Sequence, residues 1–199
     1  EAERKERAKA SLQKYKSDLF NDANAPSAGD PKADVTIVEF FDYHCGYCKH
    51  MLPVVNGILK EDKKVRFVFL EFPILSEDSV LASRAALAVN RIAKEKYFDF
   101  HQALMGMTGK FEEKNLMETA KKLGIDTAKL KEEMAKPEIT AILDKNREMA
   151  GALNINGTPA LVIGNEVIGG AVQLADLKKM VAAARSGKPI VPQEEPAKQ

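Results

Sequence analysis

The chain has two cysteines, Cys45 and Cys48, which are separated by Gly46 and Tyr47. A disulfide across so short a loop restrains the unfolded chain by only about 2 kcal/mol, so stabilisation is a poor reason for the pair. A β-prone apolar run ends just before Cys45 and a helical pattern begins after it. At a helix N-terminus, unpaired backbone N–H groups and the helix dipole favour a thiolate. The spacing therefore predicts a reactive dithiol, with Cys45 as the nucleophile and Cys48 as the resolving thiol.

Zinc binding is one alternative for these cysteines. A structural zinc site needs four ligands, and the chain has no second cysteine pair to complete one. The nearby candidate ligands are too close together in the chain to surround the ion without strain. They are His44, Cys45, Cys48 and His50. We therefore expect no metal site.

Hydrophobic packing and copper binding also stay open for this pair. Free cysteines often pack as small hydrophobic side chains, although the intervening Gly46 and Tyr47 favour an exposed turn. Two neighbouring thiolates suit Cu(I), so copper binding is the hypothesis from another functional class. Met105 and Met107 are close together among the seven methionines, but core packing explains that spacing more easily.

Length and composition predict one soluble globular body. The 199 residues suffice for a substantial core, and 45% apolar with 30% charged residues is ordinary. Thirty basic and 29 acidic residues give a net charge of +1, which gives no reason to expect nucleic acid or an anionic membrane as the main partner. The chain begins at Glu1 without a signal-like stretch, so we expect either a processed exported product or a trimmed chain.

The N-terminal segment, residues 1–20, contains good helix formers and neither glycine nor proline. Its apolar residues lie on one narrow stripe: Ala8, Leu12, Tyr15 and Leu19. Such a helix is marginal alone in water, so we expect it to pack on its own domain or on copies of itself, and we assign it to oligomerisation. Residues 21–33 are rich in Asn, Asp, Gly and Pro and are predicted to be a linker.

Residues 34–75 show a βαβ pattern around the cysteines. A buried-type strand covers 35–41, a helix continues to Glu61 with Pro53 kinking it, and a second strand covers 65–72. The crossover should be right-handed, and the two strands parallel.

Residues 76–152 carry no strand signal and are predicted to form an inserted all-helical subdomain. Ser76 supplies N-cap chemistry for its first helix. The predicted helices cover 80–92, 97–107, 112–123, 127–135 and 139–153.

Residues 153–186 return to β structure. The segments 160–163 and 166–168 predict a hairpin in which Gly164 and Asn165 supply the positive φ of a primed turn. An amphipathic helix over 174–184 follows. Residues 187–199 hold prolines and little to bury, so we expect a disordered tail.

This α/β order, with the dithiol at the first strand-to-helix junction, resembles the thioredoxin fold with an inserted helical subdomain. It is similar to the DsbA-like family of exported thiol-disulfide oxidoreductases over residues 34–186. Glu39 matches the family's buried acid, and Pro53 its kinking proline. Thr158 and Pro159 match the cis-proline loop that faces the dithiol; the cis assignment comes from the resemblance, because an average X-Pro bond is rarely cis.

Two departures refine the resemblance. Strong oxidases of this family carry Pro-His between the cysteines, whereas this chain has Gly46 and Tyr47, which implies a less stabilised thiolate and a weaker oxidant. Thr158 is the choice of isomerase-type relatives. With its N-terminal helix, the chain looks most like the ScsC (suppressor of copper sensitivity) group, which implies a disulfide isomerase or reductase. A dithiol oxidase is the alternative.

The resemblance also implies the setting. It implies a periplasmic protein that acts on unfolded or misdisulfided exported proteins and is reset by a membrane redox partner, as a homo-oligomer and without a cofactor. Glu39 is expected to accept the proton of Cys48, or alternatively to be paired with a lysine. His44 and His50 flank the dithiol and could tune it, and His101, among aromatic residues, is expected to be a packed histidine rather than a ligand.

Overall fold

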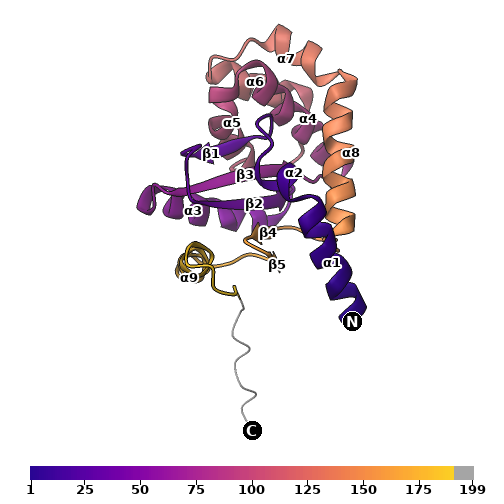
Figure 1. Ribbon diagram of the computed structural model, residues 1–199. Helices are drawn as coiled ribbons and strands as arrows, with labels where there is room; N and C mark the ends of the chain where they lie inside the picture. The colour runs from indigo at the N-terminus through magenta and orange to yellow at the C-terminus, as the bar shows by residue number, and fades with distance from the viewer. Residues whose placement is uncertain (191–199) are drawn as a thin grey trace.

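A single mixed sheet lies at the centre of the part of the chain, residues 1–190, that the computed structural model describes (Figure 1). Its strand order within these residues is β1-β3-β2-β4-β5. The strands are β1 (Ser27–Gly29), β2 (Val35–Phe41), β3 (Val65–Glu71), β4 (Ala160–Ile163) and β5 (Glu166–Gly169).

The central strand β2 pairs in parallel with β3 and antiparallel with β4. The connection from β2 to β3 is the helix α3 (Gly46–Glu61), which contains Pro53. The predicted βαβ unit and the α/β thioredoxin class are therefore confirmed. Because side chains alternate along a strand, the odd-numbered residues of β2 face α3 and the even-numbered ones face the opposite layer.

The predicted linker at residues 21–33 is partly wrong, because it contains the edge strand β1. Ser27 pairs with Val68 and Gly29 with Arg66, antiparallel. Gly29 has φ +101°, and a Cβ there would lie 2.5 Å from the carbonyl oxygen of Val65. The glycine that suggested a turn instead allows the two backbones to approach closely.

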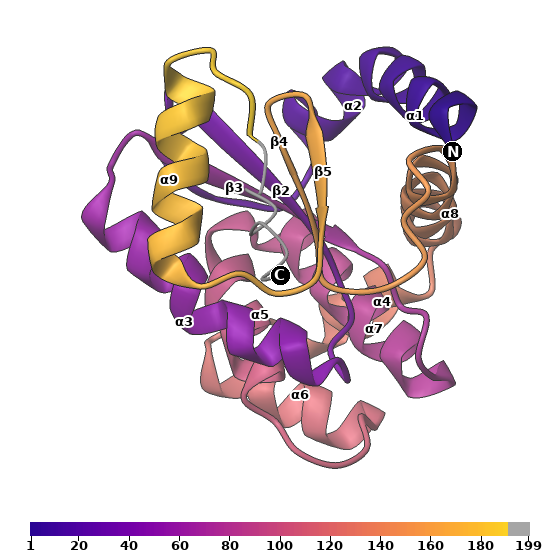
Figure 2. The ribbon, with the colours of Figure 1, turned by 90° about the horizontal axis from the view of Figure 1, so that it is seen from below.

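The N-terminal segment forms two helices, α1 (Ala2–Lys14) and α2 (Lys16–Phe20), rather than one, with the break at Tyr15. Leu12, Tyr15 and Leu19 are buried by the chain's own residues, against the even face of the sheet and α8 (Pro137–Ala152). Figure 2 shows α1 and α8 side by side. The apolar stripe therefore packs in the chain's own core, and assembly into a homo-oligomer stays a prediction that would need another surface.

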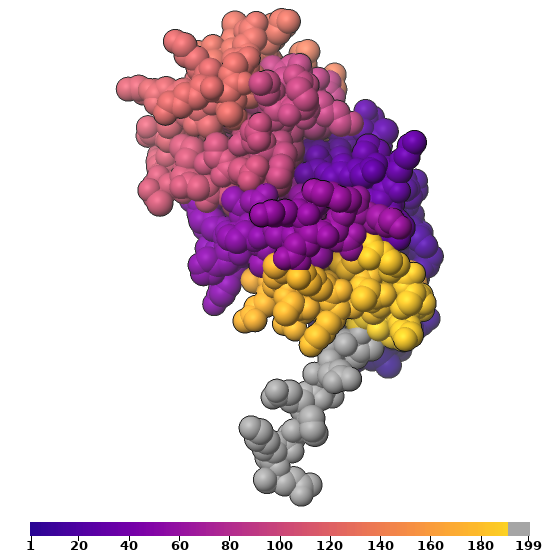
Figure 3. Space-filling view, turned by 90° about the vertical axis from the view of Figure 1, so that its left-hand side faces the viewer, coloured from indigo at the N-terminus to yellow at the C-terminus, as the bar shows by residue number. Residues whose placement is uncertain are grey.

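Residues 76–152 are helical, as predicted. Ser76 caps the first helix by accepting a hydrogen bond from the Ser79 N–H at 3.2 Å. Figure 3 shows the helices of this segment as a lobe at one end of the molecule, with the last helix, α9 (Leu174–Arg185), at the other. The helices before α8 are α4 (Glu77–Ile92), a short 3₁₀ turn (Lys94–Lys96), α5 (Tyr97–Met105), α6 (Glu113–Lys122) and α7 (Thr127–Met134).

The β4–β5 hairpin differs from its prediction in one detail. Gly164 has a positive φ of 56°, but Asn165 does not, so one residue supplies the left-handed conformation of the turn. The predicted disordered tail also begins too early, because Ile190 is 5% exposed and its side chain lies against Gly164. The rest of that predicted tail, residues 191–199, lies outside the described residues.

Two apolar layers sandwich the sheet. One layer packs α3, α4, α5 and α9 against the odd face of β2, and the other packs α1, α2 and α8 against the even face. Within residues 1–190, every helix is too short or too polar to cross a membrane.

Candidate active site

The two cysteines lie at the start of α3, just after the end of β2. Cys45 is the N-cap of α3, and its Sγ accepts a hydrogen bond from the Cys48 N–H at 3.2 Å. Both cysteines are free thiols; Cys45 is 6% exposed and Cys48 1%. Tyr47 between them is 68% exposed. The helix N-terminus thus supplies a backbone hydrogen bond to the sulfur of Cys45.

The Thr158–Pro159 peptide bond is cis, as the resemblance implied. It brings the carbonyl oxygen of Thr158 to 3.4 Å from the sulfur of Cys45, whose thiol donates to it across 113 positions of sequence. Cys45, Cys48 and this loop therefore form one site, although their roles in catalysis stay predictions.

Cys48 is chemically unlike Cys45 because it lies deeper. Burial, and then its hydrogen bond with Cys45, raise the pKa of the Cys48 thiol far above its ordinary value. The nearby Asp42 backbone and Thr158 side chain lower this pKa and offset only part of the effect. Cys48 consequently holds its proton at neutral pH, which suits a thiol that must ionise only when it resolves an intermediate.

Glu39 lies on the odd face of β2, the face that packs against α3. It is 2% exposed, and burial raises the pKa of its carboxyl to about 8. Its Oε2 has no hydrogen-bond partner within residues 1–190, and no lysine of this part of the chain forms an ion pair with it. The lysine-paired alternative is therefore wrong for the described chain, and Glu39 is a buried acid that can exchange a proton near neutral pH.

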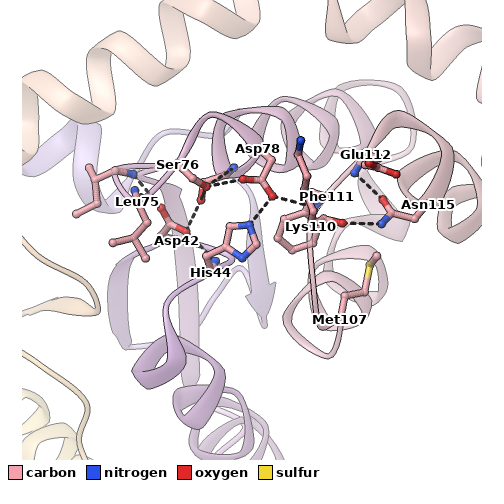
Figure 4. Close-up of polar contacts among 12 residues, drawn as sticks. Asp42, His44, Leu75, Ser76, Asp78, Met107, Lys110, Phe111, Glu112 and Asn115 are labelled. Atoms are coloured by element: carbon pink, nitrogen blue, oxygen red, sulfur yellow. Dashed lines mark hydrogen bonds and ion pairs between the residues drawn. The ribbon is translucent and has the colours of Figure 1, made fainter.

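A second carboxylate, Asp42, fixes the loop before the nucleophile, and the sequence analysis missed it. It is fully buried and accepts hydrogen bonds from two neighbouring segments (Figure 4). Its donors are the N–H of His44 at 2.8 Å, the hydroxyl of Ser79 at 2.8 Å, and the N–H groups of Ile74 at 2.9 Å and Leu75 at 3.0 Å. A single carboxylate thus joins the active-site loop to the start of α4.

His44 does flank the dithiol, but its ring is held by α4. Its Nε2 lies 2.6 Å from Oδ2 of Asp78, which also accepts from the N–H of Phe111 at 2.8 Å (Figure 4). Hydrogen bonds from the Ser76 hydroxyl and from His44 hold the pKa of Asp78 well below its usual range. His50 instead lies edge-on to the exposed ring of Tyr47, with 6.2 Å between ring centroids.

The cation next in sequence, Lys49, is also held elsewhere. Its Nζ donates to the carbonyl oxygens of Met105 at 2.9 Å and Met107 at 2.8 Å, where α5 ends. Burial lowers the pKa of Lys49. Met105 and Met107 therefore contact the residue that follows Cys48 through their backbone carbonyl groups. Among the described residues, no group of three or more His, Cys, Asp and Glu side chains is placed to hold a metal ion.

A cluster of buried titratable groups lies behind the site. His101 is 2% exposed, its Nδ1 lies 2.9 Å from the Tyr43 hydroxyl, and burial lowers its pKa to about 3. Glu71, which the sequence analysis also missed, is fully buried, and burial raises its pKa well above the usual value. The Tyr43 hydroxyl lies near this carboxyl, but its well-aligned hydrogen bond is to His101. Burial thus favours the neutral forms of both His101 and Glu71.

The sequence contains a local signal for Asp42 and a partial one for Asp78. An Asp two residues before a backbone N–H that it can bind favours a local Asx turn, which is the relation of Asp42 to His44. Ser76 and Asp78 belong to a helix-capping sequence, which placed Asp78 in the first turn of α4 but did not reveal that His44 would reach it. Glu71 gave no such signal, because it lies in an otherwise apolar strand.

Comparison with known proteins agrees with this geometry. Residues 36–182 match the family model described as a DSBA-like thioredoxin domain. The structure of a thioredoxin-like oxidoreductase from Silicibacter pomeroyi DSS-3 is 44% identical, with a TM-score of 0.80 over 85% of this chain and 97% of that one. Two other structures are similar.

The first of these is the thiol-disulfide exchange protein alpha-DsbA2 from Wolbachia pipientis, 32% identical with a TM-score of 0.83 over 92% of this chain and 97% of that one. The second is the catalytic domain of Proteus mirabilis ScsC, 29% identical with a TM-score of 0.82 over 89% and 98%. Among curated proteins, a Na(+)/H(+) antiporter NhaA 1 from Salinispora arenicola is 24% identical over 84% of this chain. The chain spans only 26% of that antiporter's length.

Proposed function

Because this chain belongs to the family of DSBA-like thioredoxin domains, we propose that it catalyses thiol-disulfide exchange, as a disulfide isomerase or reductase of the ScsC type. The observation that carries the proposal is the position of the Cys45 sulfur at the N-terminus of α3, 3.4 Å from the Thr158 carbonyl oxygen and with Cys48 one turn deeper. A nucleophilic thiolate, a resolving thiol and a backbone surface for substrate then meet at one point.

In the proposed reaction, the thiolate of Cys45 attacks one sulfur of a substrate disulfide. A bond forms between Cys45 and that sulfur, and the other substrate sulfur leaves as a thiolate. If a substrate thiolate then attacks the mixed disulfide, the substrate is isomerised and Cys45 is released unchanged. If Cys48 attacks instead, Cys45 and Cys48 become oxidised and the substrate is reduced by two electrons.

Glu39 is proposed to assist the second route. Cys48 holds its proton because burial disfavours its thiolate, so the proton must leave as Cys48 attacks. Glu39 faces the same core from β2 and, with a pKa of about 8, is close to half-ionised in mildly alkaline solution. It can therefore act as the base, directly or through water.

The proposed direction of the reaction, isomerisation or reduction rather than oxidation, rests on the hydrogen bonds of the side chains around Cys45. Among the described residues, no cationic side chain is hydrogen-bonded to the Cys45 sulfur. His44 is hydrogen-bonded to Asp78, Lys49 to two backbone carbonyl groups, and Tyr47 brings no cation. Less stabilisation of the reduced form makes a weaker oxidant and a better isomerase or reductase. A disulfide-donating oxidase remains the alternative, and a measured reduction potential would distinguish the two.

We further propose that the substrates are unfolded or misdisulfided exported proteins in the periplasm, and that a membrane redox partner resets the dithiol. The similarity to the thiol-disulfide exchange protein alpha-DsbA2 supports a disulfide-bearing substrate, and a net charge of +1 gives no reason to expect nucleic acid instead.

Reactivation of scrambled ribonuclease A tests the proposal. The reduced protein should restore ribonuclease activity faster than an equal concentration of a small thiol, and Cys45→Ser should remove the effect. Cys48→Ala should keep some isomerase activity and accumulate mixed disulfides. Reactivation no faster than the small-thiol background would refute the isomerase proposal.

A further inference from the structure

The outer edge of β5 has free backbone groups next to the active site. The N–H of Gly170 donates to the carbonyl oxygen of Pro159 at 2.8 Å, so the backbone of Gly170 faces β4. In an antiparallel pair this orientation alternates, so Glu166 and Ile168 also face β4, whereas Val167 and Gly169 face outward. Within residues 1–190, no backbone hydrogen bond satisfies the outward groups of Val167 or Gly169.

A groove runs along this edge and includes the cis-proline loop. It has a volume of about 350 Å³ and lies between the outward residues of β5 and the loop 154–158 that enters the cis peptide. Thr158 lines the groove and also receives the hydrogen bond of the Cys45 thiol. Outside the groove, Gln13 of α1 donates to Asn165 at the tip of the hairpin at 3.2 Å. Figure 2 shows β5 at the edge of the sheet on the side of α1 and α8.

Two glycines of the groove are required neither by a positive φ nor by close packing. Gly157 and Gly169 do not have positive φ, and a Cβ at either position would meet no atom within 4 Å. By contrast, a side chain at Gly29 would clash with the backbone of β3, so that position requires glycine. A glycine without a local reason in or beside a strand is typical of a place where another backbone approaches closely.

We propose that this groove binds an extended segment of the disulfide-bearing polypeptide by β-strand addition to Val167 and Gly169. The inference rests on the proposed function and adds to it the place where the substrate chain lies beyond the cis-proline loop. Binding through backbone groups is tolerant of sequence, which suits an enzyme that must accept many misfolded proteins. The walls agree with such a ligand, because they are largely polar or glycine: Asn154, Asn156, Gly157, Thr158, Gly169 and Gly170.

Gly169→Val is the decisive variant. Valine is more favourable than glycine in a strand, so the fold should tolerate it, but its side chain would occupy space that the groove leaves open. Val167→Pro is the second variant, since it removes an outward N–H that the sheet does not use and proline is tolerated on edge strands. Gly151→Ala in α8 is the matched control, because a Cβ there also meets nothing.

The measurement is the second-order rate constant of the reduced protein with two disulfides, scrambled ribonuclease A and oxidised glutathione. In Gly169→Val, exclusion of the segment at a loss of about two backbone hydrogen bonds predicts that the ratio of the first rate constant to the second falls about tenfold. Val167→Pro removes one backbone donor, so the ratio should fall about fivefold. Gly151→Ala should keep the wild-type ratio. If Val167→Pro does not fold, Gly169→Val alone decides.

Three results would overturn the inference. The first is a folded Gly169→Val variant with the wild-type ratio. The second is an equal loss with both disulfides, which would mean that the dithiol itself was disturbed. The third is a wild-type dimer that Gly169→Val converts to monomer, which would make the edge a self-association surface. A wild-type protein that reacts with glutathione but not with scrambled ribonuclease would instead refute the proposed function, and the groove's role with it.

Discussion

Glu39→Gln should make the stability of this protein less dependent on pH. Burial raises the pKa of Glu39 from its ordinary value of 4.5 to about 8 in the folded protein. Between these two values the folded state binds a proton that the unfolded state has released, so the contribution of Glu39 to stability is greatest below pH 4.5 and is lost as the pH rises. The amide of glutamine has the shape of the carboxylic acid but does not ionise.

The magnitude follows from the same two values. Each pH unit in that range costs about 1.4 kcal/mol of unfolding free energy. The wild type should therefore lose about 3 kcal/mol relative to Glu39→Gln between pH 4.5 and pH 7, and about 4 kcal/mol by pH 8, where Glu39 is half ionised in the folded protein. A constant offset from imperfect hydrogen bonding of the amide would not alter the slope.

Urea unfolding of both proteins at several pH values between 4.5 and 8.5 measures this difference. Glu118→Gln provides the matched control, since Glu118 is exposed on α6, and its curve should run parallel to that of the wild type. Parallel curves for Glu39→Gln as well would show that Glu39 ionises like an exposed acid, and the proposed role as proton acceptor for Cys48 would have to be abandoned.

Three more predictions concern the loop before Cys45, the packing of the N-terminal helices and the buried His101. Asp42→Asn should lower the unfolding free energy by about 3 kcal/mol, because the amide nitrogen that replaces one carboxylate oxygen cannot accept the two hydrogen bonds that this oxygen receives, such as those from Ile74 and Leu75 at Oδ2. An unchanged urea midpoint would contradict the role of Asp42 in joining the active-site loop to the start of α4. Leu19→Ala should cost about 3 kcal/mol if the N-terminal helices belong to the core, and less than about 1 kcal/mol if they do not. The NMR ring signals of His101 should not titrate from pH 8 to 5, since its pKa in the folded protein is about 3. Because the imidazole has a pKa of 6.5 in the unfolded chain, the unfolding free energy should fall as the pH drops below 6.5. Titration of the His101 ring near pH 6.5 in the folded protein would contradict its burial.

The elements near the dithiol were predictable because their signals are local. The β-prone run before Cys45, the helical spacing after Cys48 and the second apolar strand each follow from neighbouring residues. The strand β1 was not predictable in this way, because its three residues lie among turn-forming ones and it exists only by pairing with β3. The sequence also did not decide where the apolar face of residues 1–20 packs, since an amphipathic helix packs as well on its own domain as on another copy of the chain.

The sequence by itself determined the dithiol, its position at a helix N-terminus and the class of fold, because a two-residue spacing and periodic apolar patterns are properties of contiguous chain. The tertiary structure alone decided what surrounds the sulfurs. Asp42 reaches the loop at Ile74 and Leu75, His44 reaches Asp78, and Thr158 reaches Cys45, over separations of 32, 33, 34 and 113 positions. Such contacts depend on how the sheet and the helical insert pack together, and no local pattern specifies them.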